Sequence, residues 1–113
     1  MMKKYHWQTC GLTHTGKVRK RNEDNLFLND QQQIWLVADG AGGHANGDLA
    51  SLAVIDAFQD YESTQRIGHD VRQVITRLHK TNQYLIEQQT QSGQVSGSTA
   101  SVIVSDGRTL VCV

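Results

Sequence analysis

Apolar and polar residues follow one another along this 113-residue chain with two different periods, and each period predicts a different kind of element. Short runs rich in apolar residues predict β-strands, and they span residues 5–14, 25–28, 34–38, 100–105 and 110–113. The polar residues 29–33 and the pair Asp106-Gly107 lie between neighbouring runs and are typical of hairpin turns. The pattern therefore predicts a hairpin near each end of the chain.

Between the hairpins, apolar residues recur every three or four positions, which is typical of an α-helix with one buried face. One helix is predicted from about Leu49 to about Tyr61, and a second over about 70–90, ending before Gly93. Because strands and helices are segregated along the chain, the predicted fold class is α+β, an antiparallel sheet with helices packed on one face. The length fits one domain over residues 1–113.

The composition argues against several classes of partner. Lys plus Arg and Asp plus Glu each number 11, so neither a nucleic-acid-binding surface nor a polybasic membrane surface is predicted. The first residues lack the apolar core of a secretory signal, and no apolar stretch is long enough to cross a membrane. Cys10 and Cys112 show no metal-binding spacing, and we interpret them as buried, reduced thiols of a cytoplasmic protein.

The segment with the most chemistry follows the apolar run 34–38. The run ends on Asp39, and glycines follow, so a carboxylate is held at the end of a buried strand where the backbone can approach a ligand closely. Upstream, residues 19–24 combine arginines and a lysine with two carboxylates. Carboxylates suit Mg²⁺ or Mn²⁺, and arginine suits phosphate. Together the two clusters predict metal-assisted chemistry on a phosphate ester.

Three segments in a fixed order carry a resemblance to a known family: Gly16 to Asp24, Val37 to Ser51 and Gly97-Ser98-Thr99. They resemble the signatures of the metal-dependent protein serine/threonine phosphatases, the type 2C family, in their bacterial form. Domains of that family are longer, and the resemblance covers the N-terminal half of one.

The resemblance implies a fold and a reaction. The fold is an antiparallel β-sandwich flanked by helix pairs, a four-layer α-β-β-α arrangement of which this chain would supply about half. The reaction is hydrolysis of phosphoserine or phosphothreonine in a protein substrate by metal-activated water, with a cognate kinase as an expected partner. The run 110–113 stays apolar to the last residue, so we expect a truncated catalytic domain, and the strand edge invites self-association.

The same resemblance assigns roles to individual residues. Asp39 would bridge two Mn²⁺ or Mg²⁺ ions, with the Gly40 carbonyl as a further ligand, as a two-metal site requires. Glu23 and Asp24 would hydrogen-bond metal-bound waters and so orient the nucleophile. Arg19 would grip the phosphate through its bidentate donors.

His44 is a less direct match. In some relatives a histidine directly follows the Asp-Gly pair and acts as the general acid, whereas Ala41 holds that place here. His44 remains a candidate proton donor for the leaving alkoxide. Further metal ligands of the family come from its second half, so we expect the chain alone to bind metal weakly and to turn over little substrate.

Two other functions fit parts of the pattern. Residues 40–45 formally match a dinucleotide-binding glycine fingerprint, with Asp60 as a ribose ligand, although Asp39 would repel a pyrophosphate and the strand follows a hairpin. A non-catalytic remnant, kept as a binding or regulatory module, is the other alternative. Residues 97–99 are interpreted as structural, the closely packed start of a core strand.

Overall fold

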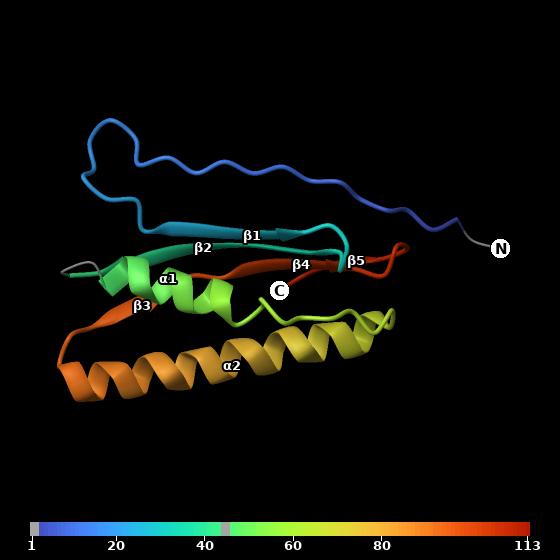
Figure 1. Cartoon of the computed structure of the whole chain (residues 1–113). Helices are drawn as coiled ribbons and strands as arrows, with labels where there is room; N and C mark the ends of the chain where they lie inside the picture. The colour runs from blue at the N-terminus through green and yellow to red at the C-terminus, as the bar shows by residue number, and fades with distance from the viewer. Residues whose placement is uncertain (1–2, 44–45) are drawn as a thin grey trace.

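The computed structural model describes residues 3–43 and 46–113. In this part of the chain the elements are β1 (Asp24–Asn29), β2 (Ile34–Gly42), α1 (Asn46–Asp56), α2 (Ile67–Ser92), β3 (Ser96–Ser98), β4 (Ser101–Ser105) and β5 (Leu110–Cys112). The strands pair antiparallel in the order β1-β2-β4-β5, and β3 pairs with the end of β2. Both helices lie on one side of this sheet (Figure 1). The predicted α+β class, with helices on one face, is confirmed.

The core lies between the sheet and the helices. Alternate residues of β2 and β4 point toward the helices because successive side chains of a strand face opposite sides. They meet the buried face of α1, the turn after it and the first half of α2. The buried cluster consists of Ile34, Leu36, Ala38, Val54, Ile55, Phe58, Tyr61, Val74, Val102 and Val104.

Strand β2 extends four residues beyond the predicted run 34–38. The extension has no apolar signal because it is held by its backbone: residues 40–42 pair with 96–98 of β3, a strand of serine and glycine. The sequence also does not predict β3, because its residues show neither alternation of apolar and polar side chains nor β-branched side chains.

Helix α1 ends at Asp56, earlier than the predicted end near Tyr61. The apolar spacing continues, but the backbone turns: the Phe58 N–H donates to the Ile55 carbonyl at 3.0 Å, and the Tyr61 N–H to the Phe58 carbonyl at 3.1 Å. Helix α2 ends where predicted, because Gly93 adopts φ 70° and its N–H donates to the Gln89 carbonyl.

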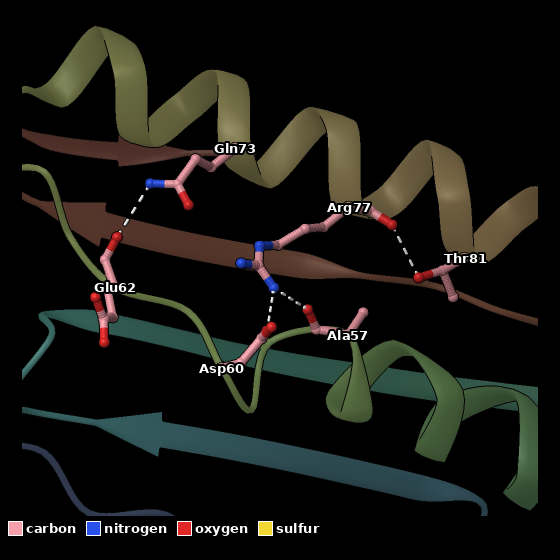
Figure 2. Close-up of polar contacts among 6 residues, drawn as sticks. All are labelled: Ala57, Asp60, Glu62, Gln73, Arg77 and Thr81. Atoms are coloured by element: carbon pink, nitrogen blue, oxygen red, sulfur yellow. Dashed lines mark hydrogen bonds and ion pairs between the residues drawn. The ribbon is translucent and has the colours of Figure 1, made fainter.

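Polar contacts tie α2 to the end of α1 (Figure 2). The Arg77 guanidinium donates to the Ala57 carbonyl at 2.6 Å and forms an ion pair with Asp60. The hydrogen bond that Arg77 donates to the Asp60 carboxylate, together with its positive charge, lowers the pKa of Asp60. Asp60, the candidate ribose ligand of the nucleotide-binding alternative, is therefore engaged by the helix, and β2 is antiparallel to each neighbour rather than opening a βαβ unit.

The loop before α2 is organised by one buried carboxylate. Asp70 has no exposed surface, and it accepts hydrogen bonds from the Ser63 hydroxyl at 2.7 Å and from the Thr64 N–H and hydroxyl at 2.8 Å each. Desolvation and the charge of Asp70 raise the pKa of the neighbouring Tyr61 phenol.

The predicted strand 5–14 is wrong. The segment runs extended beside β1 (Figure 1) without entering a ladder. Its backbone is held mainly by side chains of the β1–β2 turn: the Trp7 N–H donates to Gln33 Oε1 at 3.1 Å, and the Thr9 N–H to Asp30 Oδ2 at 3.0 Å. Alternating side chains indicate an extended backbone, but they do not show whether its N–H groups bond to side chains or to a neighbouring strand.

The cysteines also differ from expectation. Cys10 and Cys112 are both free, but both are exposed rather than buried. Cys112 belongs to β5, where it pairs in register with Ile103, which is also exposed. Of the helices in the described residues, none combines the length and apolar character needed to cross a bilayer.

Candidate metal and phosphate site

Two carboxylates lie opposite each other at the end of the β1–β2 hairpin. Asp24, the first residue of β1, pairs in register with Asp39 of β2. Because residues of a strand alternate between faces, Asp39 lies on the face away from the helices, and both side chains are exposed. Like charges directly opposite each other destabilise a strand pair unless something compensates. The pair is therefore a place where a cation would be favourable.

The electrostatics of Asp24 reflect this neighbour. Partial desolvation, then hydrogen bonding with Asp39 and its negative charge, raise the pKa of Asp24 above its ordinary 3.8. The positive charge of Arg19 acts in the opposite direction. Arg19 is exposed in the segment before β1, where its charge acts on Asp24.

A hollow of about 230 Å³ lies beside the two aspartates. With about 30 Å³ per water molecule, it has room for several waters or for an ion with part of its hydration shell. It is lined by Leu12, Thr13, Asp24, Asn25, Leu26, Val37, Ala38, Asp39, Thr99 and Ser101.

Gly40 and Gly47 bring the start of α1 against the end of β2. A Cβ atom on Gly40 would lie 1.8 Å from the Gly47 carbonyl oxygen, a distance that no side chain tolerates. Gly40 thus serves a close backbone contact with α1, whereas the predicted close approach of a ligand to these glycines stays a prediction.

Glu23 joins this contact from the other strand. Its carbonyl accepts a hydrogen bond from the Gly40 N–H at 3.1 Å. Its carboxylate lies over Gly47, where an added Cβ would be 2.9 Å from Oε1. Gly47 is in the first turn of α1, whose partial positive charge favours a carboxylate. Glu23, Asp24, Asp39 and Gly40 therefore lie together at this end of the hairpin, and the roles predicted for them stay predictions.

Thr99 is a contact of Asp39 that sequence reasoning missed. Its hydroxyl accepts a hydrogen bond from the Asp39 N–H at 3.1 Å, and its own N–H donates to the Asp39 carbonyl at 2.8 Å. The interpretation of 97–99 as closely packed is wrong at Gly97, where an added Cβ would meet no atom within 4 Å. The two partners are 60 positions apart, so only the resemblance of both segments to one family could have linked them.

The predicted role of His44 cannot be placed in the site, because residues 44 and 45 lie outside the described part of the chain. Within residues 3–43 and 46–113, no group of three or more His, Cys, Asp or Glu side chains gathers as a metal cluster. A much larger groove, about 1290 Å³, runs between α1 and α2, and neither Asp24 nor Asp39 lines it. Within the described residues, the hollow beside β1 and β2 is thus lined by two carboxylates, those of Asp24 and Asp39.

The sequence matches no protein-family model. It is similar to the serine/threonine phosphatase stp of Listeria innocua, with 39% identity over 74 residues, which are 63% of this chain and 29% of that protein. The serine/threonine phosphatase stp of Listeria welshimeri is 47% identical over 51 residues, covering 42% of this chain and 20% of that protein.

Solved structures of bacterial proteins, two of them serine/threonine phosphatases, have a similar fold. PppA, described as a key regulatory component of T6SS in Pseudomonas aeruginosa, superposes with a TM-score of 0.83 at 30% identity over 88% of this chain and 44% of its own. The Mycobacterium tuberculosis serine/threonine phosphatase PstP/Ppp gives 0.77 at 27% identity, covering 88% and 42%. The catalytic domain of PstP in complex with two manganese ions gives 0.72 at 26% identity, covering 88% and 43%.

The fold is that of PPM phosphatase domains, and this chain spans less than half the length of each of these relatives and structures. The predicted resemblance to the bacterial type 2C serine/threonine phosphatases is confirmed in both sequence and fold.

Proposed function

We propose that this chain contributes to a Mn²⁺- or Mg²⁺-dependent protein phosphatase that hydrolyses phosphoserine and phosphothreonine in protein substrates. The observation that carries the proposal is the opposed pair Asp24 and Asp39, beside a hollow and within range of the Arg19 charge. Two carboxylates that face each other across a strand pair suit a hard divalent cation with oxygen ligands. Manganese bound to the PstP catalytic domain, a structure of the same fold, supports this choice of ion.

The residues of the site would have different roles in binding the metal, the water and the phosphate. Asp39 and the Gly40 carbonyl would hold the metal, while Glu23 and Asp24 would hydrogen-bond the waters around it. The bound metal pair would supply an activated water for direct attack on phosphorus. Arg19 would hold the phosphate through two parallel N–H donors.

His44 would donate a proton to the leaving alkoxide. This role rests on the sequence alone, because the residue lies outside the described part of the chain.

The 113 residues alone would make a weak metal site. A Mg²⁺ ion prefers near-octahedral oxygen coordination, and the described residues bring two carboxylates to the hollow. We therefore expect millimolar rather than micromolar affinity for Mn²⁺ and little turnover by this chain alone.

We propose a cytoplasmic location, which the free cysteines support because cytosolic thiols stay reduced. A cognate serine/threonine kinase would supply the phosphorylated substrate. Self-association through β5 stays a prediction, which sedimentation velocity of the purified chain would test.

The proposal is tested by adding Mn²⁺ to the ¹⁵N-labelled chain and following paramagnetic broadening of its amide signals. Broadening is expected first at Asp24 and Asp39, and it should disappear in Asp39→Asn. A matched control is Asp106→Asn, because the Asp106 carboxylate accepts the Arg108 N–H at 2.9 Å in a different turn and can be replaced by an amide oxygen.

Each other outcome contradicts a defined part of the proposal. Uniform broadening, equal in Asp39→Asn, would reject the metal site. Micromolar affinity, together with Mn²⁺-dependent hydrolysis of p-nitrophenyl phosphate that Asp39→Asn abolishes, would show that this chain completes the ligand set by itself.

A further inference from the structure

A serine hydroxyl is buried at the junction between the site and α1. Ser51 has no exposed surface and lies on the face of α1 that meets the start of β1. None of the roles discussed above involves its side chain. A buried hydroxyl is costly unless its hydrogen-bonding capacity is used, so its partners show what it holds.

The hydroxyl has partners on both sides of the junction. Ser51 Oγ lies 2.6 Å from the Glu23 carbonyl oxygen and 3.1 Å from the Asp48 carbonyl of its own helix. A hydroxyl has one proton, and the shorter contact identifies Glu23 as the acceptor. The Asn25 side-chain amide donates to Ser51 Oγ at 2.8 Å. The hydroxyl thus binds the residues on either side of Asp24.

The Glu23 carbonyl is shared between two elements. It accepts the Ser51 hydroxyl from α1 and the Gly40 N–H from β2. Gly40 directly follows Asp39, so the same oxygen atom connects the Glu23–Asp24 segment with the end of the strand that carries Asp39. The close contact of Gly40 with Gly47 places α1 near enough for Ser51 to reach.

We propose that Ser51 is a positioning residue, whose hydroxyl holds Glu23 and Asp24 in register with Asp39; its consequence for metal binding rests on the function proposed above. The Ser51 hydroxyl would act through the backbone, because it fixes the Glu23 carbonyl, which also accepts the Gly40 N–H. Without it, Glu23 would keep the Gly40 hydrogen bond and its side-chain contact with Gly47, but its carbonyl would lose the hydrogen bond from α1.

The first test measures amide hydrogen exchange at Gly40 in the whole chain, without metal. Ser51→Ala should speed exchange of the Gly40 N–H about fivefold, as expected when one hydrogen bond of ordinary net strength is lost. Ser51→Thr keeps a hydroxyl and should restore slow exchange. The matched control is Ser105→Ala: Ser105 is 3% exposed, and its hydroxyl accepts the Gly107 N–H at 2.9 Å in the β4–β5 turn.

The second test repeats the Mn²⁺ titration with the same variants. Ser51→Ala should weaken the affinity about threefold to tenfold, whereas Ser105→Ala should leave it unchanged even where its stability loss is equal.

The outcomes separate this inference from the proposed function. Unchanged Gly40 exchange in Ser51→Ala, or equal acceleration in Ser105→Ala, would overturn the positioning role. Faster exchange with unchanged Mn²⁺ affinity would make Ser51 a structural residue only. If Asp39→Asn leaves the metal response unaltered, the proposed function fails, and the exchange measurement still decides what Ser51 holds.

Discussion

The two faces of the sheet are built from similar strands but have different environments. On the face toward the helices, Ile34, Val102 and Val104 are at most 1% exposed. On the opposite face, Val37 and Ile103 are 55% and 40% exposed, although they lie in the same strands. Asp24 and Asp39 stand at the end of this open face. The difference teaches that the main buried cluster lies on the helix-covered face, while the carboxylates belong to a face on which Trp35 is buried but Val37 and Ile103 are exposed.

The strongest test of this comparison removes a large buried side chain of the turn after α1, which belongs to the core on the covered face of the sheet. Phe58 has no exposed surface, so Phe58→Ala should lower the free energy of unfolding by about 4 kcal/mol through lost burial and a residual cavity. Ile103→Ala on the open face should cost less than about 1 kcal/mol. Urea denaturation of both variants measures the difference, and equal losses would contradict the division between the faces.

A second test concerns the contact between β2 and α1. In Gly40→Ala the new Cβ would meet the Gly47 carbonyl at 1.8 Å, so we expect overpacking to cost about 3 kcal/mol. Gly97→Ala is the control, because a Cβ there meets no atom within 4 Å. Its effect should stay within about 0.5 kcal/mol. Thermal unfolding monitored by circular dichroism measures both variants. Equal losses of stability in Gly40→Ala and Gly97→Ala would contradict this expectation.

Several elements of the fold could be predicted from the sequence. The run 34–38, its turn and the stop at Gly93 follow from local patterns, and they appear in the structure. The strand 96–98 could not be predicted, since backbone pairing alone holds it. The segment 5–14 was misjudged because its acceptors are side chains on a distant turn.

In the candidate site, too, only the residues that belong to a recognisable motif could be predicted. Asp39, Gly40 and the Glu23-Asp24 pair were recognisable as motifs, and the structure brings them together. Thr99 and Ser51 were not recognisable, because serine and threonine are common and their hydroxyls gain meaning only from partners far along the chain.

A smaller effect, dependent on pH, sharpens the comparison on the open face. Hydrogen bonds from Thr9 and from the Trp35 indole lower the pKa of Asp30 below 3.8. The folded pKa is thus lower than the unfolded one, so this carboxylate stabilises the protein above the unfolded pKa, and the contribution is lost as the pH falls through the folded pKa.

Asp30→Asn should therefore reduce the loss of stability as the pH falls below the ordinary 3.8 and through the lower folded pKa, measured by urea unfolding with tryptophan fluorescence. Asp56→Asn, a change of the same charge at the exposed end of α1, serves as the control. A wild-type pH dependence retained in Asp30→Asn would show that other groups account for it.

The smallest effect is expected at Thr99. Thr99→Val removes the acceptor of the Asp39 N–H and should lower the free energy of unfolding by about 1 kcal/mol or less. Thr90→Val, which removes a hydroxyl bonded to the Ile86 carbonyl within α2, gives the comparison for a helix surface. A loss above about 2 kcal/mol in Thr99→Val, without a similar loss in Thr90→Val, would show that the open face also contributes substantially to stability.

The shared Glu23 carbonyl also has a consequence for the order in which the chain folds. The Ser51 hydroxyl that reaches it is 28 positions away, and the Gly40 amide belongs to a hairpin that must already be closed. Contacts of such separation form after local ones, because their loop-closure entropy must be overcome first. A nascent chain with α1 formed and the hairpin open would hold the same carboxylates but no register between them. The hairpin alone would pair Asp24 with Asp39, and the Glu23 carbonyl would gain its second donor, the Ser51 hydroxyl, only when α1 docks against the closed hairpin.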